Sequence, residues 1–172
     1  KVFPFPEEEM TEVLGSTENM LECRAAVKTI IELFKKFYDD SYDKLIPVRA
    51  EVVVGDEELG LCGMIDQLFW NEKSGKLEIW DWKTNKKIDN KNKWQQFKSP
   101  INHLDVCELN TYSLQLSTYK YIVEKNTNLK LGDSYIVWIN EKNDKYEVFK
   151  CHDFREEVIT ILSKAHLVKS IN

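Results

Sequence analysis

The 172-residue sequence lacks several patterns that would define whole classes of protein. No apolar run approaches the roughly 20 residues that a membrane-spanning helix needs, and nothing at its start resembles a secretory signal. The four cysteines lie far apart, with no C-x-x-C pair and no zinc-like spacing to the three histidines. These absences favour reduced thiols in a cytoplasmic protein over a disulfide framework, a zinc site or an iron–sulfur cluster. There is also no internal repeat and no low-complexity segment.

The chain length and a normal apolar fraction predict one globular domain over residues 1–172, with a single core. Residues 1–16 are rich in proline and glutamate, so we expect them to form an extended lead-in. The chain opens on Lys1 rather than methionine, which indicates a fragment, a processed product or a chain whose first residues were not seen.

The spacing of apolar residues predicts a mixed α/β fold. Helical spacing begins at residue 17, and three strand-like runs follow it. A second helix, which Asn110 or Thr111 could cap, precedes a strand hairpin and a last helix. In chain order, the expected elements cover residues 17–42, 46–54, 59–70, 76–82, 112–124, 134–140, 145–150 and 153–168. The order α-β-β-β-α-β-β-α indicates a central mixed sheet flanked by helices.

Charge is distributed unevenly along the chain. The net charge of −5 argues against a nucleic-acid partner. One short segment nevertheless carries a cluster of lysines, a single acid, Asp89, and the interleaved aromatic residues Trp94 and Phe97. Its lysines are Lys83, Lys86, Lys87, Lys91, Lys93 and Lys98. Such a segment is either a solvated charged loop, which is the commoner case, or a surface that binds nucleic acid.

Two aspartates stand in apolar, strand-like surroundings in the stretch GMIDQLFWNEKSGKLEIWDWK. If its two strands pair as a hairpin with Trp70 facing Leu77, Asp66 lies directly opposite Asp81. Because side chains alternate between the two faces of a strand, Lys83 lies on the same face as both aspartates. We therefore expect these three charged groups to gather on one face of the sheet.

Carboxylates that face each other across a strand pair repel, and apolar surroundings strengthen the repulsion. A shared proton or a bound cation would compensate, and a hard divalent metal held by oxygen ligands is the more useful of the two. The alternative interpretation places both aspartates at irregular, solvated ends of edge strands. Strand geometry alone does not decide between these interpretations.

A further pair of residues extends the pattern. Gln115 and Tyr119 are four positions apart, so they share one face of the predicted helix over 112–124. Alone, this pair indicates only an amphipathic helix with a polar residue near the core. Three short segments, however, follow one another along the chain in the order typical of a known family. They are GMID, DWKT and QLSTY, and they resemble the G-x-x-D, D/E-x-K and Q-x-x-x-Y motifs of the PD-(D/E)XK nuclease superfamily, RecB-like branch. The segments RAEVVV and IWDWKTNKK are similar to the mitochondrial genome maintenance exonuclease and to nucleases of tailed bacteriophages.

This resemblance implies a restriction-endonuclease-like core and metal-assisted hydrolysis of DNA phosphodiester bonds, with Mg²⁺ or Mn²⁺ as the cofactor. The metal ligands that it implies are Asp66, Asp81 and the main-chain carbonyl of Trp82. The other matched positions are the catalytic Lys83, the site-steadying and DNA-contacting Gln115 and Tyr119, and an auxiliary Glu51. Under the same hypothesis, the residues that contact nucleic acid are Lys86, Lys87, Lys91, Lys93, Trp94, Lys98 and His103.

One departure from the family pattern concerns histidine. The branch usually carries a metal-binding histidine on a helix ahead of the first strand, whereas the first predicted helix here has none. Either that helix lies upstream of Lys1, which is the interpretation we favour, or an acid such as Glu18 or Glu22 substitutes for the histidine. His103 lies in the loop that follows the predicted strand over 76–82. A lone histidine is more often structural than a ligand, although His103 could reach substrate.

The sequence supports three functional hypotheses. The preferred one is a Mg²⁺-dependent DNA nuclease, an exonuclease or processing nuclease of phage or repair type, that acts on single strands or duplex ends. The second is a nucleic-acid-binding module that keeps the fold but does not cleave. The third is a partner-docking domain of a larger protein, in which another surface covers the face that bears the aspartates.

Overall fold

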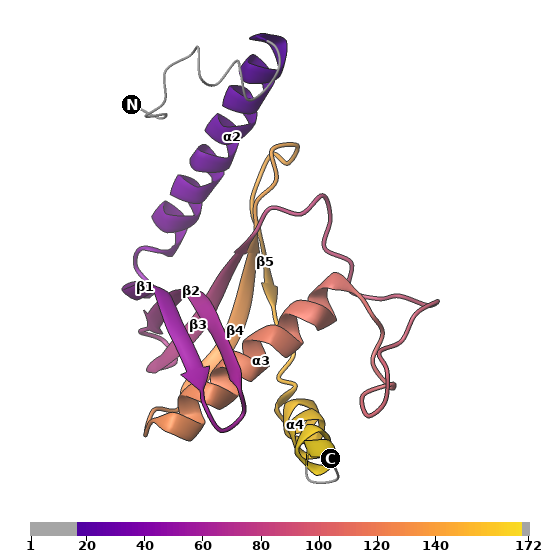
Figure 1. Ribbon diagram of the computed structural model, residues 1–172. Helices are drawn as coiled ribbons and strands as arrows, with labels where there is room; N and C mark the ends of the chain where they lie inside the picture. Colours follow the sequence, from indigo (N-terminus) through magenta and orange to yellow (C-terminus); the bar gives the residue numbers. More distant parts are fainter. Residues whose placement is uncertain (1–16, 170–172) are drawn as a thin grey trace.

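The computed structural model describes residues 17–169, and the lead-in expected over residues 1–16 lies outside the described residues. Residues 17–169 form three helices and five strands in the predicted order α-β-β-β-α-β-β-α (Figure 1). They are α2 (Thr17–Ser41), β1 (Leu45–Asp56), β2 (Leu61–Asn71), β3 (Lys76–Lys83), α3 (Glu108–Asn126), β4 (Leu131–Trp138), β5 (Glu147–Lys150) and α4 (Arg155–Lys169). Among these helices, none is both long and apolar enough to cross a membrane.

The strands form one mixed sheet in the order β1-β2-β3-β4-β5. The pairs β1–β2, β2–β3 and β4–β5 are antiparallel, whereas β3 and β4 run parallel. Parallel neighbours need a long crossover connection. The loop after β3 and helix α3 supply it, and Figure 1 shows α3 lying across one face of the sheet.

Each face of the sheet carries its own apolar cluster. On the α3 side, Ile79 of β3 and Ile136 of β4 are fully buried. Their immediate neighbours, Trp80 and Val137, belong to a second cluster that packs beneath Phe37 of α2. Since adjacent strand residues point to opposite faces, odd-numbered residues of β3 point toward α3. The same alternation determines the direction of the charged side chains at the end of β3.

Helix α3 begins earlier than its apolar spacing predicts. Its N-cap is Cys107, whose backbone is extended and whose side chain makes no capping hydrogen bond. The two expected caps lie inside the first turn and bond backwards instead. The side-chain amide of Asn110 donates to the backbone carbonyl of Asp105, and the hydroxyl of Thr111 donates to the backbone carbonyl of Cys107. Short polar side chains that serve as caps can equally make such local bonds, so the prediction of the cap was wrong.

The long connection between β3 and α3 has internal structure. Within it, the Phe97 amide donates to the Leu104 carbonyl, and the Val106 amide donates to the Gln95 carbonyl. Ile101, at its far end, is buried. The connection is therefore an ordered loop with its own small apolar centre rather than a plain linker.

Candidate active site

The end of β3 places two opposite charges under helix α3. Asp81 and Lys83 have the same parity as Ile79, so both point toward α3. The Asp81 side chain is 3% exposed and forms an ion pair with the Lys83 ammonium group. The Lys83 Nζ also lies 4.6 Å from the centre of the Tyr112 ring, which comes from the first turns of α3. The ion pair and this cation–π contact fix the position of the lysine head group.

The predicted hairpin register is confirmed as far as the ladder extends. Trp70 pairs with Leu77, and the last pair of the ladder is Gln67 with Trp80. Asp66 and Asp81 would form the next pair, but the strands separate before it. Asp66 Oδ2 instead accepts a hydrogen bond from the Trp82 amide at 3.0 Å. The two aspartates are therefore brought together beyond the ladder, not as a pair within it.

A change of face in β2 explains why the ladder stops there. Ile65 packs in the α3-side cluster, whereas Phe69 packs in the α2-side cluster. A regular strand would point these residues to one face because they are four positions apart. The buried amide of Gln67 lies between them and donates to the carbonyls of Arg49 and Leu68, at 3.0 and 2.9 Å. Its side chain thus satisfies backbone groups where the strand is irregular.

Burial raises the pKa of Asp81 above the usual range of an aspartate, and the negative charge of Asp66 raises it further. The ion pair with Lys83 opposes this shift without reversing it. In the part of the chain that the structure describes, no hydrogen bond of standard geometry reaches Asp81 Oδ2. Lys83 contacts this oxygen as an ion pair only. A buried carboxylate is costly, and the Lys83 ammonium group beside it offsets only part of the cost.

The two carboxylates fit a hard divalent metal such as Mg²⁺, which binds through one or two carboxylates, retained waters and substrate phosphates. Among residues 17–169, no cluster of three or more His, Cys, Asp or Glu side chains could hold a metal ion. The suggested substitutes Glu18 and Glu22 lie in the first turns of α2, which packs on the opposite face of the sheet (Figure 1). The structure does not bring them to the aspartates.

The Q-x-x-x-Y motif lies directly above β2. The Gln115 amide donates to the Tyr119 hydroxyl at 2.8 Å. The Tyr119 ring lies so close to the backbone of Gly63 that a Cβ atom there would be 2.6 Å from the ring Cζ. The glycine of GMID therefore allows the helix to approach the strand that carries Asp66.

Two serines of α3 support the site, and the sequence analysis did not identify them. The Ser113 hydroxyl accepts a hydrogen bond from the His152 amide, and the Ser117 hydroxyl accepts one from the Phe154 amide, both at 3.0 Å. Their spacing of four residues on a buried helix face was the available signal. These bonds hold the chain that carries Cys151, where burial raises the pKa of the thiol to about 12. The thiol is therefore uncharged and no nucleophile.

The remaining predicted residues occupy different positions. Trp82 packs its ring against Phe37 on the α2 side, so only its backbone lies beside the aspartates. Glu51 is exposed on β1 at a φ of 51°, an uncommon value for a residue other than glycine. The residues before and after Glu51 pair with the residues on either side of Asp66, so Glu51 lies beside Asp66 in the sheet. The carbonyl of Trp82 and the auxiliary role of Glu51 stay predictions.

The lysine segment forms the surface next to the site. Lys87 pairs with Asp89, and Trp94 is 95% exposed. His103 is paired with Glu157 of α4 at 3.2 Å, away from the aspartates. Lys86, Lys91, Lys93 and Lys98 are all exposed along the loop. The structure therefore ties His103 to α4 and leaves the lysines and Trp94 accessible.

The element order and the mixed sheet define a restriction-endonuclease-like α/β fold. The chain belongs to the PD-(D/E)XK nuclease superfamily, whose family model matches residues 5–169. No curated protein matches the chain.

Among solved structures, the chain resembles a protein from Eubacterium rectale that is described provisionally as an exonuclease. The TM-score is 0.50 at 16% sequence identity, over 86% of this chain and 51% of that one. This similarity concerns the fold, and the chain spans about half the length of that protein. A second structure, of the protein SSO0001, has a TM-score of 0.36 at 13% identity, over 94% of this chain and 68% of that one.

Proposed function

We propose that the protein is a Mg²⁺-dependent nuclease that hydrolyses phosphodiester bonds in DNA, of exonuclease or DNA-processing type. One observation carries the proposal: the buried Asp81 carboxylate, which pairs with Lys83, lies close enough to Asp66 for the two negative charges to repel. Membership of the superfamily supports it, because these nucleases use a divalent metal. Asp66, Asp81 and the main-chain carbonyl of Trp82 would hold Mg²⁺ or Mn²⁺.

The bound metal would supply an activated water and neutralise charge on the phosphate. The chain itself supplies position and charge. The Lys83 ammonium group is held between Asp81 and the Tyr112 ring, where it can stabilise the negative charge that develops on the phosphate. In this proposal, the hydrogen-bonded Gln115–Tyr119 pair forms the helix side of the site and contacts the DNA backbone.

The cost of keeping Asp81 ionised argues against a module that binds without cleaving. Burial and the nearby Asp66 charge both disfavour the ionised form of Asp81. A binding module gains nothing from this arrangement, whereas a metal-dependent enzyme needs it. The partner-docking hypothesis predicts that neither metal nor DNA reaches this face, so it fails if either one binds.

The test is cleavage of end-labelled DNA by the purified protein with Mg²⁺ or Mn²⁺, against an EDTA control. We expect cleavage by the parent and a loss of about 100-fold or more in Asp81→Asn and in Lys83→Met. Thermal unfolding would verify that both variants fold. A closed circular substrate separates the two modes of action, because only an endonuclease cuts it. If the parent cuts no substrate with either metal, the proposal is wrong.

A further inference from the structure

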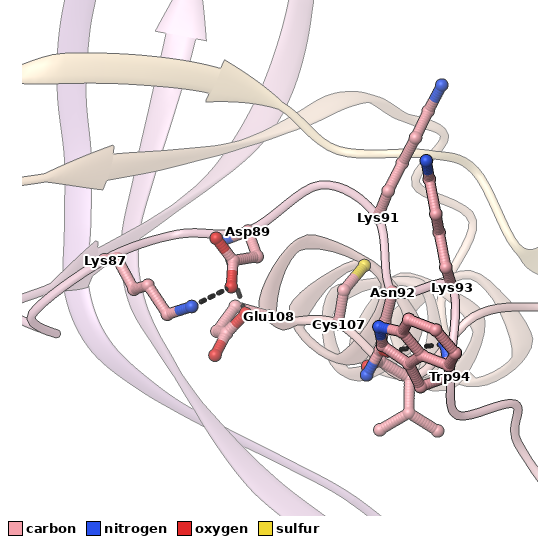
Figure 2. A pocket seen from close by; sticks show the side chains of 9 residues that line it. Lys87, Asp89, Lys91, Asn92, Lys93, Trp94, Cys107 and Glu108 are labelled. Atoms are coloured by element: carbon pink, nitrogen blue, oxygen red, sulfur yellow. Dashed lines mark hydrogen bonds and ion pairs between the residues drawn. The ribbon is translucent and has the colours of Figure 1, made fainter.

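Two hollows lie side by side between the β3–α3 loop and the first turns of α3. The first has a volume of about 530 Å³ and includes Lys91, Lys93 and Trp94 in its lining (Figure 2). The second has a volume of about 440 Å³ and includes Asn85 and Tyr112. Both are lined by Asn92, Val106, Cys107 and Glu108. Because they share these lining residues, the two hollows are adjacent, and we call the pair the Trp94 trough.

The Trp94 trough leads to the candidate active site. Tyr112 lines its inner end, and the ring of this tyrosine lies against the Lys83 ammonium group. The carbonyl of Asn85, at the same end, accepts hydrogen bonds from the side chains of Trp138 and Asn140, at 2.7 and 2.8 Å. The inner end is thereby anchored to β4. A chain molecule lying in the trough would therefore run from Trp94 to Lys83.

The outer end displays an aromatic ring that the protein does not use for packing. Trp94 is 95% exposed, although burial of an indole is strongly favourable. Its backbone is nevertheless well held. The Trp94 backbone amide donates to the Asn92 side-chain carbonyl at 3.0 Å, and the Asn92 side-chain amide donates to the Val106 backbone carbonyl at 2.8 Å. The loop thus presents the ring in a defined place, as a stacking platform does.

The charges around the ring are those that bind phosphates. Figure 2 shows Lys91 and Lys93 extending side by side, away from the pair that Lys87 forms with Asp89. Within the described residues, neither Lys91 nor Lys93 forms an ion pair, so both charges remain available to a ligand. These cations are concentrated at one place on a chain whose net charge is −5. An exposed aromatic ring next to two unpaired lysines fits a polynucleotide better than it fits a neutral partner.

We propose that the Trp94 trough binds a single polynucleotide strand, with one base stacked on Trp94 and the adjoining phosphates at Lys91 and Lys93. The strand continues past Tyr112, so that a phosphate several nucleotides away reaches Lys83. This last step rests on the proposed nuclease function, whereas binding of the strand does not. A duplex keeps its bases stacked inside the helix, so only an unpaired strand or a frayed end can stack on the ring.

Binding is measured separately from cleavage, in EDTA and on the Asp81→Asn background, by the anisotropy of labelled oligonucleotides. We expect long oligothymidylate or oligouridylate to bind more tightly than a blunt duplex, and the two arms separate DNA from RNA. Trp94→Ala should weaken single-strand binding about ten-fold, and Trp94→Phe should recover most of the loss. Trp70→Ala is the matched control, because Trp70 is also exposed but lies on β2.

The lysines are tested through the salt dependence of binding. Each of Lys91→Gln and Lys93→Gln should lower the slope of log affinity against log salt concentration by about 0.7, the value for one phosphate contact to a single strand. Lys73→Gln, in the exposed turn between β2 and β3, should leave the slope unchanged. Unchanged slopes in both trough variants would contradict the proposal.

Cleavage assays then connect the trough to the active site. On a long single strand, Trp94→Ala should raise KM about ten-fold with little change in kcat. On a dinucleotide, which is too short to reach the ring, Trp94→Ala should behave like the parent.

Failure of the trough and failure of the nuclease function give different results. Trp94-dependent binding without cleavage by the parent would support the trough and refute the nuclease. Cleavage of long strands that ignores Trp94 would refute the trough alone. An acidic peptide that binds as tightly as the oligonucleotides, with the same dependence on Trp94, would make the trough a protein-binding site and overturn the proposal.

Discussion

Two carboxylate–lysine groups lie at opposite ends of helix α3, and they are built in opposite ways. Near the C-terminal end, Asp56 accepts hydrogen bonds from Lys125 at 2.6 Å, from Asn126 at 3.0 Å and from the Leu59 amide at 2.9 Å. These bonds lower the pKa of Asp56 to about 2. Near the N-terminal end, Asp81 has only its ion pair with Lys83, and burial raises its pKa.

The difference separates a structural group from a functional one. Asp56 joins the β1–β2 turn to the end of α3, and every interaction around it favours the ionised form that it needs for that purpose. Asp81 is buried with one cation, Lys83, and with the repelling charge of Asp66, so its ionisation costs stability, as is typical of functional sites. We therefore expect residues of the same chemical type to contribute to stability at one end of the helix and to activity at the other.

The largest effect that would test this comparison is on activity. Lys83→Arg should lower the cleavage rate by about 100-fold or more, because a planar guanidinium does not replace an ammonium group held between Asp81 and the Tyr112 ring. Lys125→Arg should keep both the rate and the melting temperature, since an arginine can still pair with Asp56 and Glu58. The measurement is the initial rate on end-labelled single-stranded DNA with Mg²⁺. An equal loss of cleavage rate in Lys83→Arg and Lys125→Arg would contradict the distinction between the two groups.

A smaller effect concerns the close approach of α3 to β2. Gly63→Ala should push the Tyr119 ring away from the strand, lower activity about ten-fold and destabilise the fold by about 1–3 kcal/mol. Gly55→Ala is the matched control on β1, where the nearest atom to an added Cβ is the Leu61 carbonyl oxygen at 3.5 Å. Cleavage rates and urea unfolding of both variants test the prediction. If Gly63→Ala changed neither the cleavage rate nor the stability, the helix would not need this close approach.

The smallest effects are on the pH dependence of stability, and their signs are opposite. Asp81 has a raised pKa, so its ionisation opposes folding, and Asp81→Asn should raise the melting temperature by about 2–4 °C at pH 7 to 8. Asp56 has a lowered pKa, so its ionisation favours folding, and Asp56→Asn should lower the melting temperature by about 5 °C.

The two differences should also disappear in different pH ranges. The gain in Asp81→Asn should shrink as the pH falls through the raised pKa of Asp81 in the parent. The loss in Asp56→Asn should persist down to about pH 4, the ordinary range of the unfolded carboxylate, and vanish toward pH 2. Melting curves between pH 2 and 8 would reveal both. Shifts of the same sign in the two variants would contradict the assignment of their roles.

Much of the fold could be predicted because it depends on local spacing. The alternation of apolar residues places Ile79 on the α3 side, and the same alternation carries Asp81 and Lys83 to that face. The register of the β2–β3 hairpin follows from its short loop, and Trp70 does pair with Leu77. The order of the elements follows from the same spacing.

The rest could not be predicted because it depends on distant segments. Regular alternation does not foresee the face change between Ile65 and Phe69, which Gln67 supports by bonding to a carbonyl of β1. Spacing also does not reveal that Ser113 holds the chain after β5, or that His103 pairs with α4. Each of these contacts joins residues far apart in the sequence.

The sequence by itself predicted the charged residues of the candidate site from motif order, and it determined the strand face that Asp81 and Lys83 share through the period of two. Only the tertiary structure decided how Asp66 reaches Asp81, through the end of the ladder and the docking of α3 over Gly63. It also decided that the lysine loop and Tyr112 form one trough. The physical reason is that local spacing controls the direction of side chains, whereas the distance between segments depends on packing across the whole sheet.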